Sequence, residues 1–483
     1  MSTPATHHLP LVVDLDGTLV ATDTLFEAAL RLMKRAPWML FPLLLWCIRG
    51  RSVLKQKVAQ LQPLDASSLP YREDVLAWLN HEFQTGRRLI LATAADRRVA
   101  QRVFDHLKIF SDLLASDGKI NLKGPQKLQA IQQLVGGNFV YAGDSRADMP
   151  IWKAANAAVL VAASASVSQA VRSGTVVERE FQGPPGTWKT FAKAIRVHQW
   201  VKNVLLFVPA LTSFAFDGTR LSVLLLAFLA FSLTASATYI VNDLWDLEND
   251  RAHPTKRNRP FASGALSIPA GAFVALLCLA GGIALATMVG RGFLVCLLVY
   301  LVATSLYSWV LKTYVLLDVL SLALLYTLRI LAGSVALGVS TTPWLLAFSM
   351  FTFLSLALVK RCAELVTMQE NGRTSARGRD YRVSDLTVLW PMGVGAALAS
   401  VVVFGLFIST ADTQARYATP SLLWLVTTAL IYWLSRLWVK TARGEMHDDP
   451  VVYALKDRGS RWTVMGMLLM TIAARTVPLP ALQ

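Results

Sequence analysis

The hydrophobic pattern of the chain changes near its middle. Residues 1 to about 165 have the pattern of a soluble α/β protein, in which short apolar runs end in polar residues. From about residue 203 onward, apolar runs of roughly 18 to 22 residues recur, and a helix of that length can span a bilayer. The pattern predicts one soluble α/β domain joined to one all-α membrane domain.

The apolar runs of the second half predict about nine membrane-spanning helices. We expect them at residues 203–216, 222–241, 269–289, 292–311, 315–337, 344–359, 388–409, 420–438 and 463–481. Residues 166–190 lose strong patterning and carry Pro184 and Pro185, so they are expected to form a linker. This gives a soluble domain at 1–165 and a membrane domain at 191–483.

The composition agrees with a membrane protein, because 54% of the residues are hydrophobic and only 16% are charged. The net charge of +16 is high. Its bases do not form one stripe with interleaved aromatic residues, so we expect no nucleic-acid partner. They lie between the apolar runs, mostly in alternate loops. The positive-inside rule places these loops and the N-terminal domain in the cytoplasm, as in a bacterial inner-membrane protein.

The segment "LPLVVDLDGTLV" at residues 9–20 is a buried-strand pattern that ends in two carboxylates. Open α/β sheets bind ligands at the carboxyl ends of their strands. Asp14 is placed to attack a phosphorus atom, and Asp16 to protonate the leaving oxygen and later activate water. Thr93, at the end of a second strand, is expected to hold a phosphate oxygen, and Lys127 at a helix start is expected to supply a countercharge.

A third strand, within "NFVYAGDSRADMPIW", ends in Asp144 and Asp148. Their carboxylates suit Mg²⁺, which takes oxygen ligands in octahedral geometry. Together with Asp14 and Asp16 they form the expected metal site of this domain.

These four pieces, in this order, resemble the haloacid dehalogenase superfamily of phosphohydrolases over residues 9–165. The resemblance implies a Rossmann-like fold, phosphatase activity and a helical cap at about residues 22–75. Within that cap, "APWMLFPLLLWCIRG" at residues 36–50 is apolar and aromatic, is flanked by bases and is short for a membrane span. Two interpretations stay open: a segment lying in the membrane interface, or a cap helix packed on its own domain.

The segment "NDLWDLENDRAHPTKRNRPFASG" at residues 242–264, called the acidic segment below, follows the second apolar run. Asp243, Asp246 and Asp250 are three and four positions apart, so on a continuing helix they share one face, with Asn242 beside them. Mg²⁺ bridged to a diphosphate would neutralise these carboxylates. The bases that follow are expected to face an anionic substrate: Arg251, Lys256, Arg257 and Arg259.

The pattern N-D-x-x-D-x-x-x-D in a chain with many spans resembles the UbiA-type intramembrane prenyltransferases over about residues 190–480. Further segments are similar to decaprenyl-phosphate phosphoribosyltransferases, among them "HQWVKNVLLFVPAL", "VKRCAEL" and "GEMHDDPVVYALKDRGS". The resemblance implies Mg²⁺-dependent transfer of 5-phosphoribose from phosphoribosyl pyrophosphate to a polyprenyl phosphate. The soluble domain would then remove the 5-phosphate.

The same resemblance suggests residues that position the substrates: Lys202, Tyr307, Lys312 and Asp318. Aromatic prenyltransferases of the superfamily carry a second D-x-x-x-D after their sixth span. This chain has Lys360, Arg361 and Glu364 there, which favours binding of additional phosphate groups.

Two other functions are considered. One is an aromatic prenyltransferase that uses a prenyl diphosphate and carries a phosphatase with a separate substrate, but the basic loop after the sixth span argues against it. The other is a lipid-binding scaffold without activity, which the intact acidic sets in both halves disfavour.

Overall fold

The computed structural model describes residues 8–117, 120–183, 188–214, 217–372, 374, 379–446 and 449–478, except the side chains of Arg51 and Leu455. Pro184 and Pro185 of the expected linker, and the dipeptide at 447–448, lie outside the described residues. The chain divides into two compact units. The first unit comprises Met1–Ile195 with Tyr239–Ala275, and the second comprises Arg196–Thr238 with Leu276–Gln483.

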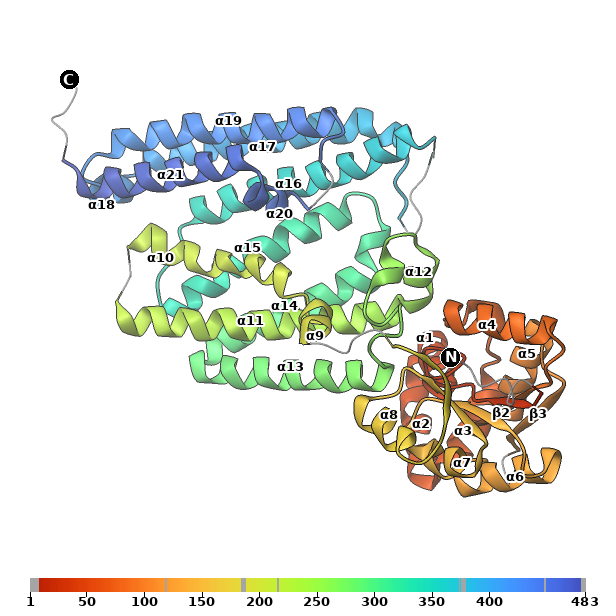
Figure 1. Cartoon of the computed structure of the whole chain (residues 1–483). Coiled ribbons are helices and arrows are strands. Elements are labelled where there is room, and N and C mark those ends of the chain that lie inside the picture. Colours follow the sequence, from red (N-terminus) through yellow and green to blue (C-terminus); the bar gives the residue numbers. More distant parts are fainter. Residues whose placement is uncertain are drawn as a thin grey trace. The chain divides into compact units, whose positions relative to one another are not determined.

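The first unit contains a six-stranded sheet in the order β3-β2-β1-β4-β5-β6, with every pair parallel. Figure 1 labels two of its strands, β2 and β3. Its strands are β1 (Leu11–Val13), β2 (Leu89–Asp96), β3 (Asp112–Ser116), β4 (Val140–Gly143), β5 (Ala157–Val161) and β6 (Val177–Phe181). The central strands are fully buried because helices cover both faces of a parallel sheet. The expected α/β domain is confirmed.

Helices follow the strands of this sheet in sequence: α4 (Glu73–Gln84), α5 (Arg97–Leu107), α6 (Pro125–Val135), α7 (Met149–Ala154) and α8 (Ala165–Arg172). Alternate residues of β1 feed two cores, since Val12 packs with Ile90 and Tyr141 on one face and Leu11 packs with Leu89 on the other. We call Leu11–Phe181 with its helices the α/β domain.

The expectation of a linker at residues 166–190 is wrong for most of this range. Most of α8 and all of β6 fall inside that range, and β6 pairs with β5. The α/β domain therefore extends to Phe181, and α9 (Trp188–Ala194) follows soon after. β6 is an edge strand whose middle residues are exposed, so its sequence lacks the apolar run that marks the other strands.

The insert between β1 and β2 forms helices at the position expected for the cap. They are α1 (Thr24–Arg35), α2 (Leu40–Arg49) and α3 (Arg51–Leu61). Asp23 caps α1 by accepting from the Leu25 amide, and Lys34 and Arg35 fill its last turn. This helical insert therefore begins only a few residues after Asp16.

Seven helices in the described part of the chain are long and apolar enough to cross a membrane. They are α11 (Gly218–Trp245), α13 (Ile268–Val289), α14 (Arg291–Trp309), α15 (Leu317–Leu337), α16 (Pro343–Glu370), α17 (Leu386–Ile408) and α19 (Leu423–Ala442). These seven match seven of the nine expected spans.

The first and last expected spans have a different form. Of the first, residues 203–213 belong to a 3₁₀ stretch, η4 (Val197–Phe207), and to the short α10 (Val208–Ser213). Pro209 explains why no long α-helix runs through this point, because proline lacks the amide needed inside a helix. Of the last, residues 463–476 belong to α21 (Arg458–Thr476), which is not among the seven apolar helices.

The remaining elements are short: α12 (Leu247–Ala252), α18 (Ala411–Arg416), α20 (Pro450–Lys456), η1 (Pro37–Met39), η2 (Ala66–Ser68), η3 (Arg146–Asp148), η5 (Lys256–Asn258), η6 (Leu311–Thr313), η7 (Val383–Asp385) and η8 (Pro420–Leu422).

The second unit is held together by close helix packing around α15, α16, α17 and α19. Gly393 of α17 shows why small residues matter here, since a Cβ at this position would lie 2.1 Å from the Trp438 ring. The Trp438 indole donates to Ser355 Oγ at 3.0 Å, and Ser355 donates to the Gly393 carbonyl at 2.9 Å. The polar groups of this contact are therefore satisfied inside the apolar core.

Candidate functional site

Carboxylates gather where the central strands of the α/β domain end. Asp14 directly follows β1, Asp144 directly follows β4, and Asp148 ends η3 a few residues later. One oxygen of each lies within 4.8 Å of the others. Since β1 and β4 are neighbours in the sheet, their carboxyl ends bring together residues about 130 positions apart. The sequence prediction named all three.

Gly17 allows the loop after β1 to approach this cluster. Its φ is +79°, and a Cβ here would lie 2.2 Å from Asp144 Oδ2. Only glycine combines that backbone conformation with that absence of volume. Arg72 fixes the same loop, because its Nε donates to the Gly17 carbonyl at 3.1 Å.

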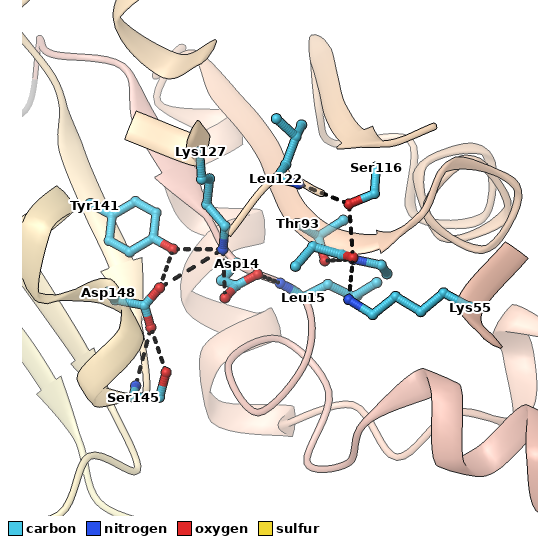
Figure 2. Close-up of polar contacts among 12 residues, drawn as sticks. Asp14, Leu15, Lys55, Thr93, Ser116, Leu122, Lys127, Tyr141, Ser145 and Asp148 are labelled. Carbon is cyan, nitrogen blue, oxygen red and sulfur yellow. Dashed lines mark hydrogen bonds and ion pairs between the residues drawn. The ribbon is translucent and has the colours of Figure 1, made fainter. Parts of the chain in front are cut away.

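Lys127 is the buried countercharge of the site (Figure 2). Its Nζ lies 2.9 Å from Asp14 Oδ2 and 3.8 Å from Asp148 Oδ1. It also donates to the Tyr141 hydroxyl at 3.0 Å, and that hydroxyl donates to Asp148 at 2.8 Å. Tyr141 was missed in the sequence because it reads as an ordinary strand residue. One lysine therefore bridges the expected nucleophile and a second carboxylate.

The electrostatics of the cluster show an excess of negative charge. Burial raises the pKa of Asp14, against the opposing charge of Lys127. Burial, with the carboxylates of Asp14 and Asp148, raises the pKa of Asp144 to about 7. Burial lowers the pKa of Lys127, but the carboxylates of Asp14 and Asp148 outweigh it and raise this pKa overall. Lys127 is thus stabilised in its charged form, but its single positive charge does not balance three carboxylates.

This cluster fits a divalent cation with oxygen ligands. Three carboxylate oxygens converge there, and the raised pKa of Asp144 shows that Lys127 does not offset their negative charge. Asp16, which we had expected in the metal set, is not part of the converging group. Its Oδ1 accepts from the Thr24 amide at 2.9 Å, at the start of α1. Burial and the nearby Asp23 raise the pKa of Asp16 to about 7. That environment suits a proton donor better than a metal ligand.

Thr93 lies inside β2, which continues to Asp96 with a register shift against β3 after Thr93. The Thr93 hydroxyl accepts from the Ala95 amide at 3.0 Å. Beside it, Lys55 of α3 reaches from the helical insert and donates to the Ala94 carbonyl at 2.6 Å. A pocket at this place includes Asp16, Thr24, Lys55 and Asp96 in its lining. Lys55 was missed because nothing in the sequence links it to the strand ends.

The acidic segment keeps helical hydrogen bonding beyond the end of α11. Asn242 and Asp243 lie in the last turn of α11, and Asp246 stands between α11 and α12. The Asp246 amide donates to the Asn242 carbonyl at 2.8 Å, and the Asp250 amide donates to the Asp246 carbonyl at 2.9 Å. Helical hydrogen bonding therefore continues through the acidic segment, as the expected common face requires.

Asp243 and Asp250 share one guanidinium. Arg259 Nη1 donates to Asp243 at 3.0 Å and to Asp250 at 2.6 Å. Both aspartates are only 3% exposed. Two buried carboxylates thus share one arginine. Arg259, expected as a substrate ligand, is a partner of these carboxylates in this structure.

Arg251 is also placed differently from the expectation. Its guanidinium binds Glu27 of α1 through both nitrogens, at 2.5 and 3.1 Å, and Glu27 is 1% exposed. The acidic segment and α1 belong to the same unit, and Leu30 packs with Leu247 and Phe261. Arg251 therefore anchors the acidic segment. Lys256 and Arg257, in η5, are exposed and remain candidates for an anionic substrate.

A second set of expected residues meets in the second unit. Lys202 and Lys360 both contact Asp449 Oδ2, at 2.9 and 3.2 Å. Burial alone would raise the pKa of Asp449, but these two lysines lower it to about 2. Asp449 was not predicted as a site residue, although an aspartate before a proline is a recognisable helix cap. The three side chains form one cationic site with a fixed acceptor.

Asp318 and Arg361 form a buried ion pair with 2.6 Å between Oδ2 and Nη2. The Tyr381 hydroxyl donates to Asp318, and Arg361 also binds Glu364. Glu364 accepts from Arg379 as well, at 3.0 Å. One continuous network between α15 and α16 thus joins three predicted site residues, Asp318, Arg361 and Glu364.

Tyr307 lies in α14 and Lys312 in η6, and both are half-buried. Sequence reasoning missed Arg329 of α15, a buried base inside a candidate span. It donates to Asn203 at 2.9 Å, to the Tyr300 hydroxyl at 3.0 Å and to the Leu325 carbonyl at 2.6 Å. An arginine inside an apolar run is itself the signal that could have identified it.

The membrane half matches a known family. Residues 206–477 match the model of the UbiA prenyltransferase family. The chain belongs to that family. With its seven apolar helices it is an integral membrane protein of a transferase family.

Individual relatives extend this finding. The Sinorhizobium fredii protein y4nM is 39% identical over 466 residues, which cover 95% of this chain and 90% of that protein. The similarity therefore extends over both the α/β domain and the UbiA domain. The decaprenyl-phosphate phosphoribosyltransferase of Mycobacterium tuberculosis is 31% identical, over 57% of this chain and 91% of that protein. The structure of a UbiA homolog from Archaeoglobus fulgidus bound to GPP and Mg²⁺ covers 60% of this chain and 100% of its own, with 13% identity and a TM-score of 0.46.

Proposed function

We propose that the UbiA domain transfers 5-phosphoribose from phosphoribosyl pyrophosphate to a polyprenyl phosphate. The similarity to a protein named decaprenyl-phosphate phosphoribosyltransferase, over 57% of this chain, carries this proposal. The bases in α16 support it, because Lys360 and Arg361 stand where the aromatic prenyltransferases carry a second acidic pair for magnesium. An oxygen of the lipid phosphate attacks the anomeric carbon of the ribose, and pyrophosphate leaves.

The acidic segment would hold the leaving pyrophosphate. Asp243, Asp246 and Asp250, with Asn242, are the residues that would bind Mg²⁺, which when bound neutralises the charge that builds up on pyrophosphate. Arg259, now shared by two of these carboxylates, is placed to exchange one of them for a phosphate oxygen. Exposed Lys256 and Arg257 would attract the anionic donor.

We also propose that the α/β domain removes the 5-phosphate from the lipid-linked product. Asp14 would attack phosphorus, and its contact with Lys127 at 2.9 Å orients it and favours its ionised form against the effect of burial. Asp16, with its raised pKa, would protonate the leaving oxygen and then take a proton from the water that hydrolyses the aspartyl-phosphate. Mg²⁺ on Asp14, Asp144 and Asp148 would supply charge neutralisation for the phosphoryl group.

The transfer reaction is tested with the full-length protein, polyprenyl phosphate, phosphoribosyl pyrophosphate and Mg²⁺, with the lipids identified by mass spectrometry. We expect a polyprenylphosphoryl ribose. Asp243→Asn should lower transfer on the order of a hundredfold or more, whereas Asp412→Asn, an exposed aspartate in α18, should not change it. A product formed only from a prenyl diphosphate and an aromatic acceptor would contradict the proposal.

The phosphatase reaction is tested through the ratio of phosphorylated to dephosphorylated lipid. Asp14→Asn should accumulate the 5-phosphate form at an unchanged initial rate of transfer, since the two reactions use different carboxylates. Asp105→Asn, an exposed aspartate in α5, is the matched control. An unchanged ratio in Asp14→Asn would mean that the α/β domain acts on some other phosphate.

A further inference from the structure

The cap contains a helix whose apolar side chains point away from its own domain. In α2 and the preceding η1, Ile48 is 84% exposed, Phe41 70% and Trp38 69%. Leu40, Leu44 and Leu45 are exposed as well, and Leu43 is the one buried residue of α2. Single exposed apolar residues are common on proteins, but a contiguous group of this kind marks a surface that contacts something apolar.

The exposed residues lie on one side of the helix. At 100° per residue, Phe41, Leu44, Leu45 and Ile48 fall within an arc of about 100°, and Leu43 lies on the opposite side. Leu43 belongs to the core of the α/β domain, against which Trp46 also packs. One face of α2 therefore packs against the α/β domain, and the opposite face is exposed. This observation decides against the interpretation that α2 is simply a cap helix packed on its domain.

The charges around α2 indicate which apolar partner this face fits. Lys34 and Arg35 end α1 just before it, and Arg49 ends α2 itself. Bases beside an apolar and aromatic face complement the anionic headgroups and the acyl boundary of a bilayer. A helix of ten residues is about 15 Å long, so it cannot cross a hydrocarbon core of about 30 Å. It has the length and composition of a helix that lies in the interface.

We propose that the exposed face of α2, together with Trp38, inserts into the headgroup region of the membrane in which the UbiA domain resides. The occupant of this face is the lipid bilayer itself. The bilayer is present by necessity, because the same chain is an integral membrane protein.

This contact has a consequence for the pocket under the cap, and the consequence rests on the proposed phosphatase function. The pocket beside Asp16 is lined by Leu25 and Ala28 of α1 and by Val58 and Ala59 of α3, the two helices that flank α2. A cap held at the bilayer surface would keep this partly apolar pocket at the level where lipid-linked phosphates present their headgroups. Substrates embedded in lipid would gain from the contact, and soluble phosphate esters would not.

Spin labels test the membrane contact directly, in the full-length protein in nanodiscs that contain anionic lipid. The four natural cysteines are first replaced, because Cys47 is exposed on α2. Labels at Phe41→Cys and Ile48→Cys should be more accessible to oxygen, which concentrates in lipid, than to a water-soluble nickel chelate. A label at Lys57→Cys, an exposed position on α3, should show the opposite preference.

Two results would overturn the proposal. Labels at positions 41 and 48 that are as accessible to the nickel chelate as the label at position 57 would place the face in water. Labels shielded from both reagents would place it against protein, either a second copy or the chain's own helices.

A functional measurement uses Ile48→Asp, with Lys57→Asp as the matched control. Ile48→Asp should lower kcat/KM about tenfold for a lipid-linked phosphate in bilayers, with the loss mainly in KM. Hydrolysis of a soluble phosphate ester should be unchanged in both variants, which also shows that the domain is folded. Equal kcat/KM for the lipid in Ile48→Asp and wild type would refute the consequence. If no phosphate is hydrolysed by any variant, the phosphatase function fails while the spin-label result stands on its own.

Discussion

The ion pair between Arg251 and Glu27 gives a prediction that does not depend on the function of the protein. Both side chains are nearly buried, at 11% and 1% exposure, and the guanidinium binds the carboxylate through two nitrogens. Removing one partner of such a pair leaves a buried charge without compensation, which costs about 3 to 5 kcal/mol. Glu27 also accepts from the Thr22 hydroxyl at 3.1 Å, so we expect the lower end for Arg251→Met, about 3 kcal/mol.

A double-mutant cycle isolates the pair. Glu27→Gln, Arg251→Met and the double variant are compared by pulse proteolysis in urea, which reports the free energy of unfolding of the unit that contains both residues. We expect a coupling energy of about 2 to 3 kcal/mol, because the double variant no longer contains an unpaired charge.

A second ion pair in the same unit is the control. Arg31 lies 2.5 Å from Glu248, but Glu248 is 44% exposed, so solvent screens the interaction. The same cycle with Arg31→Met and Glu248→Gln should give a coupling below about 1 kcal/mol. If the Glu27 and Arg251 variants are additive within about 0.5 kcal/mol, the acidic segment does not dock on α1 through this pair.

Three further predictions follow from single positions. Gly17→Ala should abolish hydrolysis of a soluble phosphate ester, because its Cβ would lie 2.2 Å from Asp144. Gly86→Ala is the control and should retain activity, since Gly86 has a similar φ of +86° but open space around it. Equal rates in the two variants would refute this prediction. Asp449→Asn leaves Lys202 and Lys360 without their shared carboxylate and should cost about 3 kcal/mol, measured as a lower Tm in detergent. Cysteines introduced at Arg257 and Asp412 report topology, and we expect only position 412 to react with an impermeant thiol reagent in intact cells; the reverse would invert the orientation.

The sequence was sufficient where the signal is local. Seven spans could be predicted because each needs only one long apolar run. The cluster of Asp14, Asp144 and Asp148 could be predicted because a buried strand followed by a carboxylate places that carboxylate at the functional edge of a parallel sheet. In both cases each piece of the signal, an apolar run or a strand with its carboxylate, is a short continuous stretch of sequence.

The sequence was insufficient where the partner is distant. Glu27 and Arg251 are 224 positions apart, and each looks like an ordinary helix charge until the fold buries both. The same holds for Asp449, which meets Lys202 across 247 positions. β6 was assigned to a linker for another reason: an edge strand buries little, so "VEREF" carries no apolar run.

The docking of the acidic segment on α1 connects two acidic clusters through one helix. The first amide of α1, at Thr24, holds the carboxylate of Asp16, and Glu27, within the first turn, holds Arg251. Further contact comes from Gly264, where a Cβ would lie 2.4 Å from the Ala21 carbonyl. The start of α1 is therefore fixed from both sides, by the loop that carries Asp16 and by the segment that carries Asp243 and Asp250. Because rigid packing transmits small displacements, loss of Arg251 should disturb the position of Asp16 even though the two residues do not touch. In Arg251→Met, a lower rate of soluble ester hydrolysis together with unchanged hydrolysis in Arg31→Met would be the kinetic sign of this shared helix.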